Sequence, residues 1–530
     1  MKKSLQIAFL AGILLALFHP AAFAEITWAR TYGGGGSDVA YSVQQTRDGG
    51  YVVAGITNSF GADYYDDDYD ILVLKLDALG KIRWQKTYGG ASDDCAYSIQ
   101  QTTDGGYVVA GYTFSFGVGG GVWPGYMNIW VLKLDADGNV GPLFPGTWRR
   151  AYGGDDWDEA RSVQQTADGG FIVSGYTWSF GGPRRNAWVL KLNPYGRVIW
   201  QKVYGGDEVT SIQQTMDGGF VASGYIDTDT PAWPDGWLDN DIWVLRLDAW
   251  GNVYWSKSYG SGNWEFTASI EETTCCGFVV TGATWSDDSQ SFDVLVLKLG
   301  ASGNVSWQKT YSRIIMDEWP ASIRQTADGG FVVAGYTDSV GAGGYDFWVL
   351  KLDVCGNVTW QKTYYNGSPT KIGEPIQQTG DGGYVVAGYT DSVGAGGYDF
   401  WVLKLDANGE IDPSCTFYSD TFVTSANSTI ETRDASRWWT KSTMMSEESN
   451  VTSVDSEVTF FEQCANPDFD GDGEPNATDN CPMVPNNQDE DADGDDVGDA
   501  CDPDYLMMIR AMREAIEERK VIEKWFLPSP

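Results

Sequence analysis

Residues 321–364 read ASIRQTADGGFVVAGYTDSVGAGGYDFWVLKLDVCGNVTWQKTY, and closely related sequence recurs seven times along the chain. A Gln/Thr element marks each copy, at Gln45, Gln101, Gln165, Gln214, Glu272, Gln325 and Gln378. A Trp element keeps the same spacing, at Trp28, Trp84, Trp148, Trp200, Trp255, Trp307 and Trp360. A fixed period of about 50 residues predicts a solenoid, a propeller or an array.

Each repeat contains four strand signals. In the quoted unit we expect strands at 321–326, 331–337, 347–353 and 357–364, which we call a to d. Asp-Gly-Gly and Gly-Asn separate a from b and c from d, and these residues suit tight hairpin turns. Strand c is almost wholly apolar, as in a sheet buried on both faces. One repeat therefore predicts one blade, and seven predict an all-β, seven-bladed β-propeller over residues 25–411.

The two ends of the repeat array predict a closed ring. The array opens with a lone strand d at 26–33, and its last unit stops after strand c at 400–406. The first strand can therefore complete the last blade, which removes two exposed sheet edges. An open solenoid would leave both edges unpaired and would usually carry capping repeats.

The repeat resembles a family of secreted bacterial and archaeal seven-bladed propellers. The resemblance rests on W-x-x-T-Y-G-G, D-G-G-Y-x-V-x-G and D-x-x-V-x-K-L-D signatures and covers about residues 26–411. It implies the propeller fold and implies no catalytic residues.

Long, variable loops are expected on one face of the ring. The a–b and c–d turns are short and regular, whereas the b–c loops at 58–69, 114–128 and 227–241 are long. Variation on one face of a repetitive scaffold is where binding specificity usually lies. The b–c and d–a segments supply these candidate ligand-binding aromatics: Trp123, Tyr126, Trp157, Trp178, Trp233, Trp237, Trp264, Trp285 and Trp319. Such rings would stack on sugars; the alternative is that they fill gaps between blades or cover the channel mouth.

Other recurring or charged residues have structural interpretations. Strand c carries one basic residue in every blade: Lys75, Lys133, Lys191, Arg246, Lys298, Lys351 and Lys404. A semi-buried cation needs a partner, so we expect pairs between blades with acids or carbonyls. The Gln/Thr side chains of strand a are expected to line the central channel. The acidic tract 63–70 could bind a cation, but such a run is more often a solvated loop.

The N-terminal residues predict export. Lys2 and Lys3, an apolar run at 5–18 and Ala22-Phe23-Ala24 form a signal peptide that would be cleaved after Ala24. We therefore expect a secreted or cell-surface protein, with no other stretch long enough to span a membrane. The only histidine, His19, would leave with the signal, which removes the commonest general base.

The charge and the motifs exclude several function classes. A net charge of −38 repels nucleic acid and anionic membranes and favours divalent cations. No nucleophile motif, phosphate loop or dinucleotide fingerprint is present. Two carboxylates could serve a glycosidase, but aspartate is too abundant to single out a pair. The sequence therefore predicts no catalytic residue.

An acidic segment at 466–503 predicts calcium binding. Its oxygen ligands would come from Asp468, Asp470, Asp472, Glu474, Asp479, Asp491, Asp493, Asp495, Val497, Asp499 and Asp502. Such spacing wraps Ca²⁺ in a tight loop, with Glu474 and Val497 acting through their carbonyls. Without the cation the segment would repel itself, so metal binding supplies its folding energy. The segment resembles thrombospondin type 3 repeats, which implies Ca²⁺ as the cofactor.

The remaining segments yield three expectations. Residues 412–465 read as a Ser/Thr-rich spacer or small β element. Export permits disulfides, and we expect Cys415 to pair with Cys464 and Cys481 with Cys501. The adjacent Cys275 and Cys276 would form a strained disulfide or stay free, and Cys95 and Cys355 have no obvious partner. Residues 504–530 predict an amphipathic helix that docks on its own chain or on a partner.

Together these features predict a secreted, calcium-binding adhesion or ligand-binding protein that uses the long-loop face. The expected partner is a glycan or a cell-surface protein, and enzymatic activity is not expected. One alternative is a carbohydrate-active enzyme, a glycoside hydrolase or lyase, with carboxylates on that face. Another is a structural component of a surface layer or matrix.

Overall fold

The structure is a computed structural model. It describes residues 27–60, 68–117, 126–227, 240–261, 263–274, 277–286, 290–312, 317–338, 345–365, 370–391, 394 and 396–411, with six short strands between 418 and 465. The predicted signal peptide, calcium segment and C-terminal helix lie outside these residues. Within them, no helix is long and apolar enough to cross a membrane.

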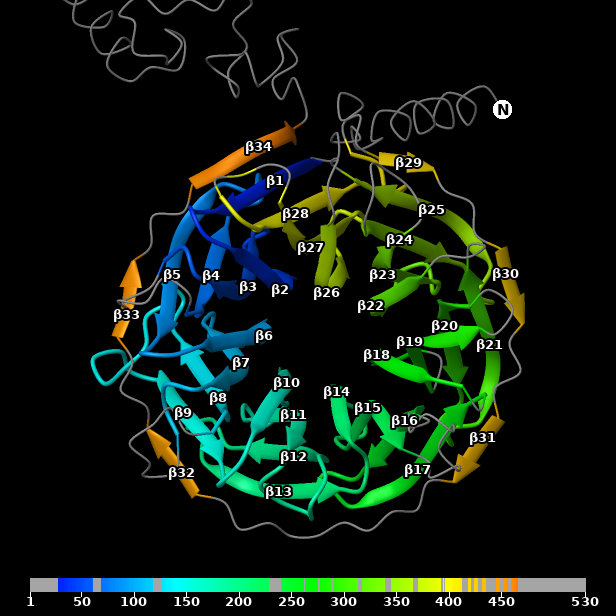
Figure 1. The fold of residues 1–530 in the computed structure, drawn as a ribbon, viewed down its shortest axis with the longest axis horizontal. Helices are drawn as coiled ribbons and strands as arrows, with labels where there is room; N and C mark the ends of the chain where they lie inside the picture. The colour runs from blue at the N-terminus through cyan, green and yellow to red at the C-terminus, as the bar shows by residue number, and fades with distance from the viewer. Residues whose placement is uncertain are drawn as a thin grey trace, which may run out of the picture.

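Seven four-stranded antiparallel blades surround a central axis, which confirms the predicted propeller (Figure 1). Blades 1 to 3 are formed by β2 (Asp38–Gln45), β3 (Tyr51–Thr57), β4 (Asp70–Leu76) and β5 (Ile82–Gly89); β6 (Asp94–Gln101), β7 (Tyr107–Thr113), β8 (Asn128–Leu134) and β9 (Trp148–Gly153); β10 (Asp158–Gln165), β11 (Phe171–Thr177), β12 (Asn186–Leu192) and β13 (Val198–Tyr204). Blades 4 and 5 are formed by β14 (Glu208–Gln214), β15 (Phe220–Asp227), β16 (Asn240–Leu247) and β17 (Val253–Gly260); β18 (Glu265–Glu272), β19 (Phe278–Ser286), β20 (Ser291–Leu299) and β21 (Val305–Ser312). Blades 6 and 7 are formed by β22 (Glu318–Gln325), β23 (Phe331–Thr337), β24 (Asp346–Leu352) and β25 (Val358–Tyr364); β26 (Thr370–Gln378), β27 (Tyr384–Thr390), β28 (Asp399–Leu405) and β1 (Trp28–Gly33).

The first strand closes the ring, as the repeat boundaries predicted. β1 pairs antiparallel with β28, from Trp28 opposite Lys404 to Tyr32 opposite Phe400. The strand that opens the array is therefore strand d of blade 7 (Figure 1). Without this pairing, β1 and β28 would each present an exposed sheet edge.

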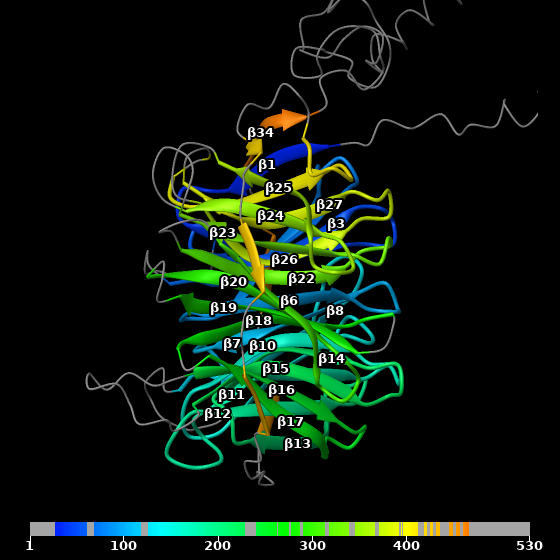
Figure 2. The same cartoon turned by 90° about the vertical axis from the view of Figure 1, so that its right-hand side faces the viewer.

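Six further strands form an outer belt that the sequence did not reveal. They are β29 (Tyr418–Asp420), β30 (Thr424–Asn427), β31 (Glu431–Asp434), β32 (Met445–Glu448), β33 (Thr452–Asp455) and β34 (Thr459–Ala465). In order they pair with strand d of blades 6, 5, 4, 2, 1 and 7, so the chain runs back around the ring (Figures 1 and 2). The stretch predicted as a spacer or small β element thus contributes a fifth strand to six blades.

The core lies between neighbouring blades. One apolar cluster, for example, joins Val52 and Val73 of blade 1 to Val109 and Trp130 of blade 2. Strand c is buried along its whole length in most blades, as its apolar sequence predicted. The Trp that begins each W-x-x-x-Y element packs on the next blade, where Trp84 meets the Tyr107 ring edge-on at 5.7 Å. These interdigitating layers join each blade to the next around the ring.

Candidate functional site: the central channel and the long-loop face

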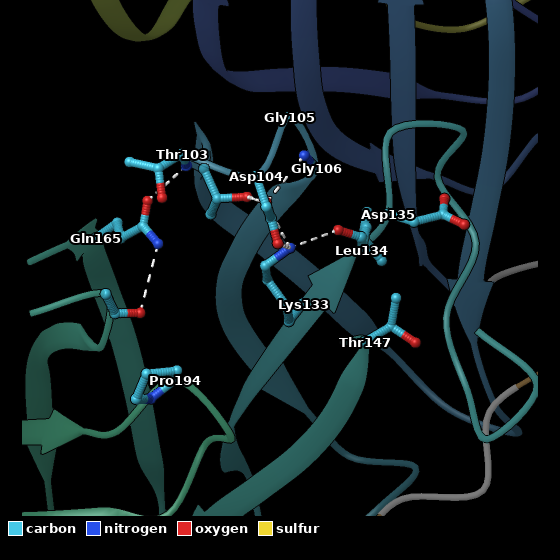
Figure 3. Close-up of polar contacts among 12 residues, drawn as sticks. Thr103, Asp104, Gly105, Gly106, Lys133, Leu134, Asp135, Thr147, Gln165 and Pro194 are labelled. Atoms are coloured by element: carbon cyan, nitrogen blue, oxygen red, sulfur yellow. Dashed lines mark hydrogen bonds and ion pairs between the residues drawn. The ribbon is translucent and has the colours of Figure 1, made fainter. Parts of the chain in front are cut away.

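The recurring basic residues of strand c pair within their own blade, not between blades. Lys133 Nζ lies 2.9 Å from Asp104 Oδ2 in the a–b turn and donates to the Leu134 carbonyl (Figure 3). The same acid pairing recurs for Lys75, Lys191, Arg246, Lys351 and Lys404. The expected acid and carbonyl partners are thus found, but the expected interblade placement is wrong, because the a–b turn folds back over strand c of the same sheet. Lys298 donates to the Leu299 carbonyl.

The Asp-Gly-Gly turn therefore serves as an anchor. The Lys351 ammonium and the Thr326 hydroxyl bind Asp328 and, despite its partial burial, lower its pKa to about 2. Gly329 has φ +82°, a conformation that a side chain would strain. The turn holds this face in a fixed shape and leaves its charges paired.

Tyrosine hydroxyls connect neighbouring blades around the entire ring. In each case strand d donates to a glycine carbonyl in the c–d turn of the next blade. The pairs are Tyr32–Gly80, Tyr88–Gly138, Tyr152–Gly196, Tyr204–Gly251, Tyr259–Gly303, Tyr311–Gly356 and Tyr364–Gly409, at 2.5–2.8 Å. Tyr32 belongs to β1, so the closing strand makes the same contact as the other six.

The second glutamine of the Gln-Gln-Thr element forms another complete ring. Its Oε1 accepts from a backbone N–H in the a–b turn of the preceding blade, as in Thr103 to Gln165 at 2.7 Å (Figure 3). Seven such bonds occur, with Glu272 replacing glutamine once: Arg47–Gln101, Thr103–Gln165, Ala167–Gln214, Met216–Glu272, Thr274–Gln325, Ala327–Gln378 and Gly380–Gln45. We call these residues the turn-face glutamine ring.

The first glutamine of the element lines the central channel. Its Oε1 accepts from a backbone N–H in the next blade, that of the second residue of the Gln-Gln-Thr element. The pairs are Gln377–Gln45, Gln44–Gln101, Gln100–Gln165, Gln164–Gln214 and Gln213–Glu272, at 2.6–2.8 Å. Glu271 accepts from Gln325 in the same way, and blade 6 carries Arg324 at this position. We call this set the channel ring.

The channel encloses a cavity of about 530 Å³. The channel ring lines it, as do serines of strand a such as Ser42 and Ser98. The threonines of the element were also expected there, but Thr46 instead donates to Asp48 in the a–b turn. The expectation is therefore correct for the first glutamine of the element, whereas the second glutamine bonds to a neighbouring turn. It is wrong for Thr46, because β2 ends at Gln45 and Thr46 already belongs to the a–b turn.

Strand a contains a β-bulge near the end of the channel that opens on the long-loop face. We call this end the mouth. The a–b register shifts at the same place in six blades, at Tyr41, Tyr97, Arg161, Thr210, Ala268 and Ala321. These six residues all line the cavity. A bulge re-aims side chains locally, and here it places residues that differ from blade to blade around one opening.

Blades 3 and 4 build a charged network at this mouth. Arg161 binds Glu159 at 2.9 Å and Glu208 at 2.6 Å, and both carboxylates are buried. Tyr176 donates to Glu159 at 2.7 Å, and Tyr225 donates to Glu208 at 2.8 Å. Burial raises the pKa of Glu159, and the Arg161 charge opposes that effect. These ion pairs and hydrogen bonds fix the Arg161 guanidinium at the channel wall.

Aromatic rings pack against the arginines of this network. The Arg161 guanidinium lies 4.5 Å from the Tyr97 ring centre, and Tyr97 contacts Tyr41 at 5.0 Å. Arg185 binds Glu208 at 3.2 Å and stacks near Tyr225. Burial raises the pKa of the neighbouring Cys95 well above its usual value, so this free cysteine stays protonated.

The candidate ligand-binding aromatics divide into two groups. Tyr126, Trp157 and Trp178 are 49 %, 50 % and 41 % exposed. They lie close together, since Asp158 N donates to the Met127 carbonyl and Trp178 N donates to the Trp157 carbonyl. We call these three residues the exposed aromatic patch, at the junction of blades 2 and 3.

The aromatics of blades 5 and 6 pack against one another instead. Trp319 lies 4.3 Å from Phe292, which also contacts Trp285 at 5.1 Å. Trp264 is half-buried, and its carbonyl accepts from Trp285 N. Trp123, Trp233 and Trp237 lie outside the described residues. The packing alternative is therefore correct for Trp285 and Trp319.

The predicted metal ligands lie outside the described residues. This applies to all eleven from Asp468 to Asp502 and to Asp63–Asp67 of the acidic tract, whereas Asp70 is buried in β4. The part of the chain that the structure describes contains no group of three or more His, Cys, Asp or Glu that could hold a metal. Cys415, Cys275, Cys276, Cys481 and Cys501 are also outside it, and Cys355 is free and exposed.

The comparisons concern the C-terminal segment. Residues 463–489 match the family model of the thrombospondin type 3 repeat. The matched range includes the first set of expected ligands, Asp468 to Asp479, and thrombospondin type 3 repeats bind calcium and are typical of extracellular proteins. None of the curated proteins compared with the chain matches it. The chain thus combines a seven-bladed β-propeller with a segment that matches the thrombospondin type 3 repeat model, which is compatible with a calcium-binding extracellular protein.

Proposed function

We propose that this protein is a secreted or cell-surface adhesion protein that binds a glycan through the exposed aromatic patch. The patch carries the proposal, because three adjacent rings remain exposed on a face where the equivalent rings of blades 5 and 6 are packed. Exposed Trp and Tyr faces beside polar groups suit the apolar faces and hydroxyls of sugars.

The mouth network supports binding over catalysis. Glu159 and Glu208, two buried carboxylates of the mouth, are held by arginine and tyrosine partners. A general acid or base must exchange a proton with the substrate, and a carboxylate that is committed to a salt bridge is poorly placed for that role. Asp158, which follows Trp157 of the patch, is a buried carboxylate that accepts from Ser179 Oγ and Gly154 N, and burial raises its pKa to about 6. The enzyme alternative would have to use this carboxylate, since no arginine or lysine pairs with it among the described residues.

Calcium would act on the C-terminal segment. We propose that Asp468, Asp470, Asp472, Glu474 and Asp479, with the second set from Asp491 to Asp502, bind Ca²⁺ and give that segment its folded form.

A glycan array with the full secreted chain tests the proposal. Trp157→Ala and Trp178→Ala should each abolish most binding, because aromatic anchors dominate such contacts. Trp250→Ala is the matched control, since Trp250 is 69 % exposed but lies in a c–d turn on the opposite face. Equal losses for all three variants would contradict the proposed patch, and release of shortened sugars would favour the enzyme alternative.

Chelation tests the calcium component separately. Removal of Ca²⁺ should expose residues 466–503 to proteolysis and leave the propeller fragment intact. Binding of the array glycan should survive in the propeller. Unchanged proteolysis of 466–503 with and without chelator would contradict calcium-dependent folding there.

A further inference from the structure

The channel ring has donors that the protein does not use. A backbone N–H group can only donate a hydrogen bond. A glutamine side chain that bonds to it must therefore accept through its Oε1. This fixes the orientation of Gln377, Gln44, Gln100, Gln164 and Gln213. Each amide therefore has only its NH₂ group left for the cavity.

These five glutamines come from consecutive blades. They belong to blades 7, 1, 2, 3 and 4, and all five line the cavity of about 530 Å³. None of their Nε2 atoms has a hydrogen-bond partner among the described residues. The glutamines of the turn-face ring differ, since Gln165 Nε2 lies 3.4 Å from the Gly169 carbonyl of its own turn (Figure 3).

The two remaining blades complete the ring with charged residues. Blade 5 supplies Glu271 and blade 6 supplies Arg324, and the Arg324 charge opposes the rise that burial causes in the Glu271 pKa. Arg324 Nη1 also donates to Ser269 and to the Ile323 carbonyl. The acid and the base offset each other, so the five amides form an arc of donors without a matching set of acceptors.

We propose that the channel ring binds a small oxyanion, with the amide NH₂ groups of Gln377, Gln44, Gln100, Gln164 and Gln213 as its donors. A sulfate or carboxylate group offers acceptor oxygens in several directions at once, which suits donors arranged around an axis. This site is distinct from the exposed aromatic patch and does not depend on the proposed glycan function.

The chain itself provides the ideal test variant. Glu271 shows that a carboxylate at this position still accepts the interblade hydrogen bond, from Gln325 N. Gln164→Glu should therefore keep that bond, lose one donor and add a negative charge at the site. Gln165→Glu is the control, because it adds the same charge one residue away, in the ring where Glu272 is tolerated.

Calorimetric titration of the full chain with sodium sulfate, at constant ionic strength in chloride, measures the affinity. Gln164→Glu should weaken binding about tenfold or more, since it removes a hydrogen bond to a charged group and adds a like charge. Gln165→Glu should bind as the wild type does. Glu271→Gln should bind more tightly, because it adds a sixth NH₂ group and removes the opposing charge.

Three results would overturn the inference: no sulfate binding by the wild-type protein, equal affinities of Gln164→Glu and Gln165→Glu, or no gain in Glu271→Gln. If Gln164→Glu fails to fold, the Glu271→Gln comparison alone decides. A parallel titration with a sulfated monosaccharide identifies the source of the oxyanion: a higher affinity than for sulfate indicates a group carried on a sugar, and a lower affinity indicates a free ion.

Discussion

The two faces of the propeller differ in how faithfully they repeat. On the turn face, the tyrosine contacts and the turn-face glutamine ring occur in all seven blades. On the long-loop face, the bulge position holds tyrosine in two blades, arginine in one and small residues in others. Repeated contacts hold the ring together, whereas a ligand needs its contacts only once. The variable long-loop face is therefore where the proposed glycan binding is expected, and the turn face is where stability is expected.

The pKa values of aspartates on the two faces are also shifted in opposite directions. Lysine partners and hydrogen bonds lower the pKa of turn-face aspartates, to about 2 for Asp328. On the long-loop face, burial dominates and raises the pKa of Asp94 to about 7 and of Asp158 to about 6. Charge is thus stabilised on one face and disfavoured at these positions of the other.

The largest expected effect tests the interblade core that both faces share. Trp130→Ala should lower the free energy of unfolding by about 3–5 kcal/mol, because Trp130 is fully buried and its removal leaves a cavity. Urea denaturation measures the loss. Trp130→Leu is the control, since Leu72 and Leu295 occupy the equivalent place in blades 1 and 5. A Leu variant as unstable as the Ala variant would contradict the equivalence of the blades.

Opposite pH dependence tests the electrostatic comparison. Native Asp94 binds its proton more tightly than the unfolded chain does, so its contribution to stability is present at low pH and declines as pH rises towards about 7. Asparagine does not titrate. Between low pH and about pH 7, the free energy of unfolding of Asp94→Asn should therefore fall by on the order of 2 kcal/mol less than that of the wild type. Native Asp328 binds its proton less tightly, so its contribution is present above about pH 4 and is lost as pH falls towards 2.

Urea unfolding at pH 4, 6 and 8 separates the two aspartates. Asp94→Asn should gain stability relative to wild type as pH rises, whereas Asp328→Asn should be less stable than wild type at pH 6 and 8. The same pH profile for both variants would refute the assignment of opposite environments.

A smaller effect tests the closure of the ring. Tyr32→Phe removes a buried hydrogen bond to the Gly80 carbonyl and should cost about 1 kcal/mol. Tyr364→Phe removes the same contact between blades 6 and 7 and should cost the same. A negligible effect for Tyr32→Phe beside a measurable one for Tyr364→Phe would argue against β1 as the closing strand.

The smallest effect on stability belongs to the exposed aromatic patch. Trp157→Ala and Trp250→Ala should each change the free energy of unfolding by about 0.5 kcal/mol or less, because both side chains are at least half exposed. Only Trp157→Ala should change glycan binding. A large destabilisation by Trp157→Ala would assign that ring to packing instead.

Much of the fold could be predicted from local sequence. The strands expected at 331–337 and 347–353 correspond to β23 at Phe331–Thr337 and β24 at Asp346–Leu352. The repeat number and the offset ends also predicted the closing strand. These features are local or periodic, so apolar alternation and turn residues were sufficient to find them.

Long-range contacts could not be found in this way. The intrablade partner of Lys133 and the two glutamine rings depend on where a turn meets a neighbouring strand. The outer belt was missed because strands such as β31 at Glu431–Asp434 lack an apolar pattern and pair through the backbone with an edge already formed.

The sequence by itself determined seven blades, their closure and an acidic segment that matches the thrombospondin type 3 repeat. Periodicity and ligand spacing are properties of the chain in order, so no coordinates were needed to recognise them. Only the tertiary structure decided which of the many aromatic rings stay exposed and which amides face the channel. Burial and hydrogen-bond direction depend on neighbours in the next blade, which lie 50 residues away in the chain for Gln164 and Gln214 and 65 for Gln100 and Gln165.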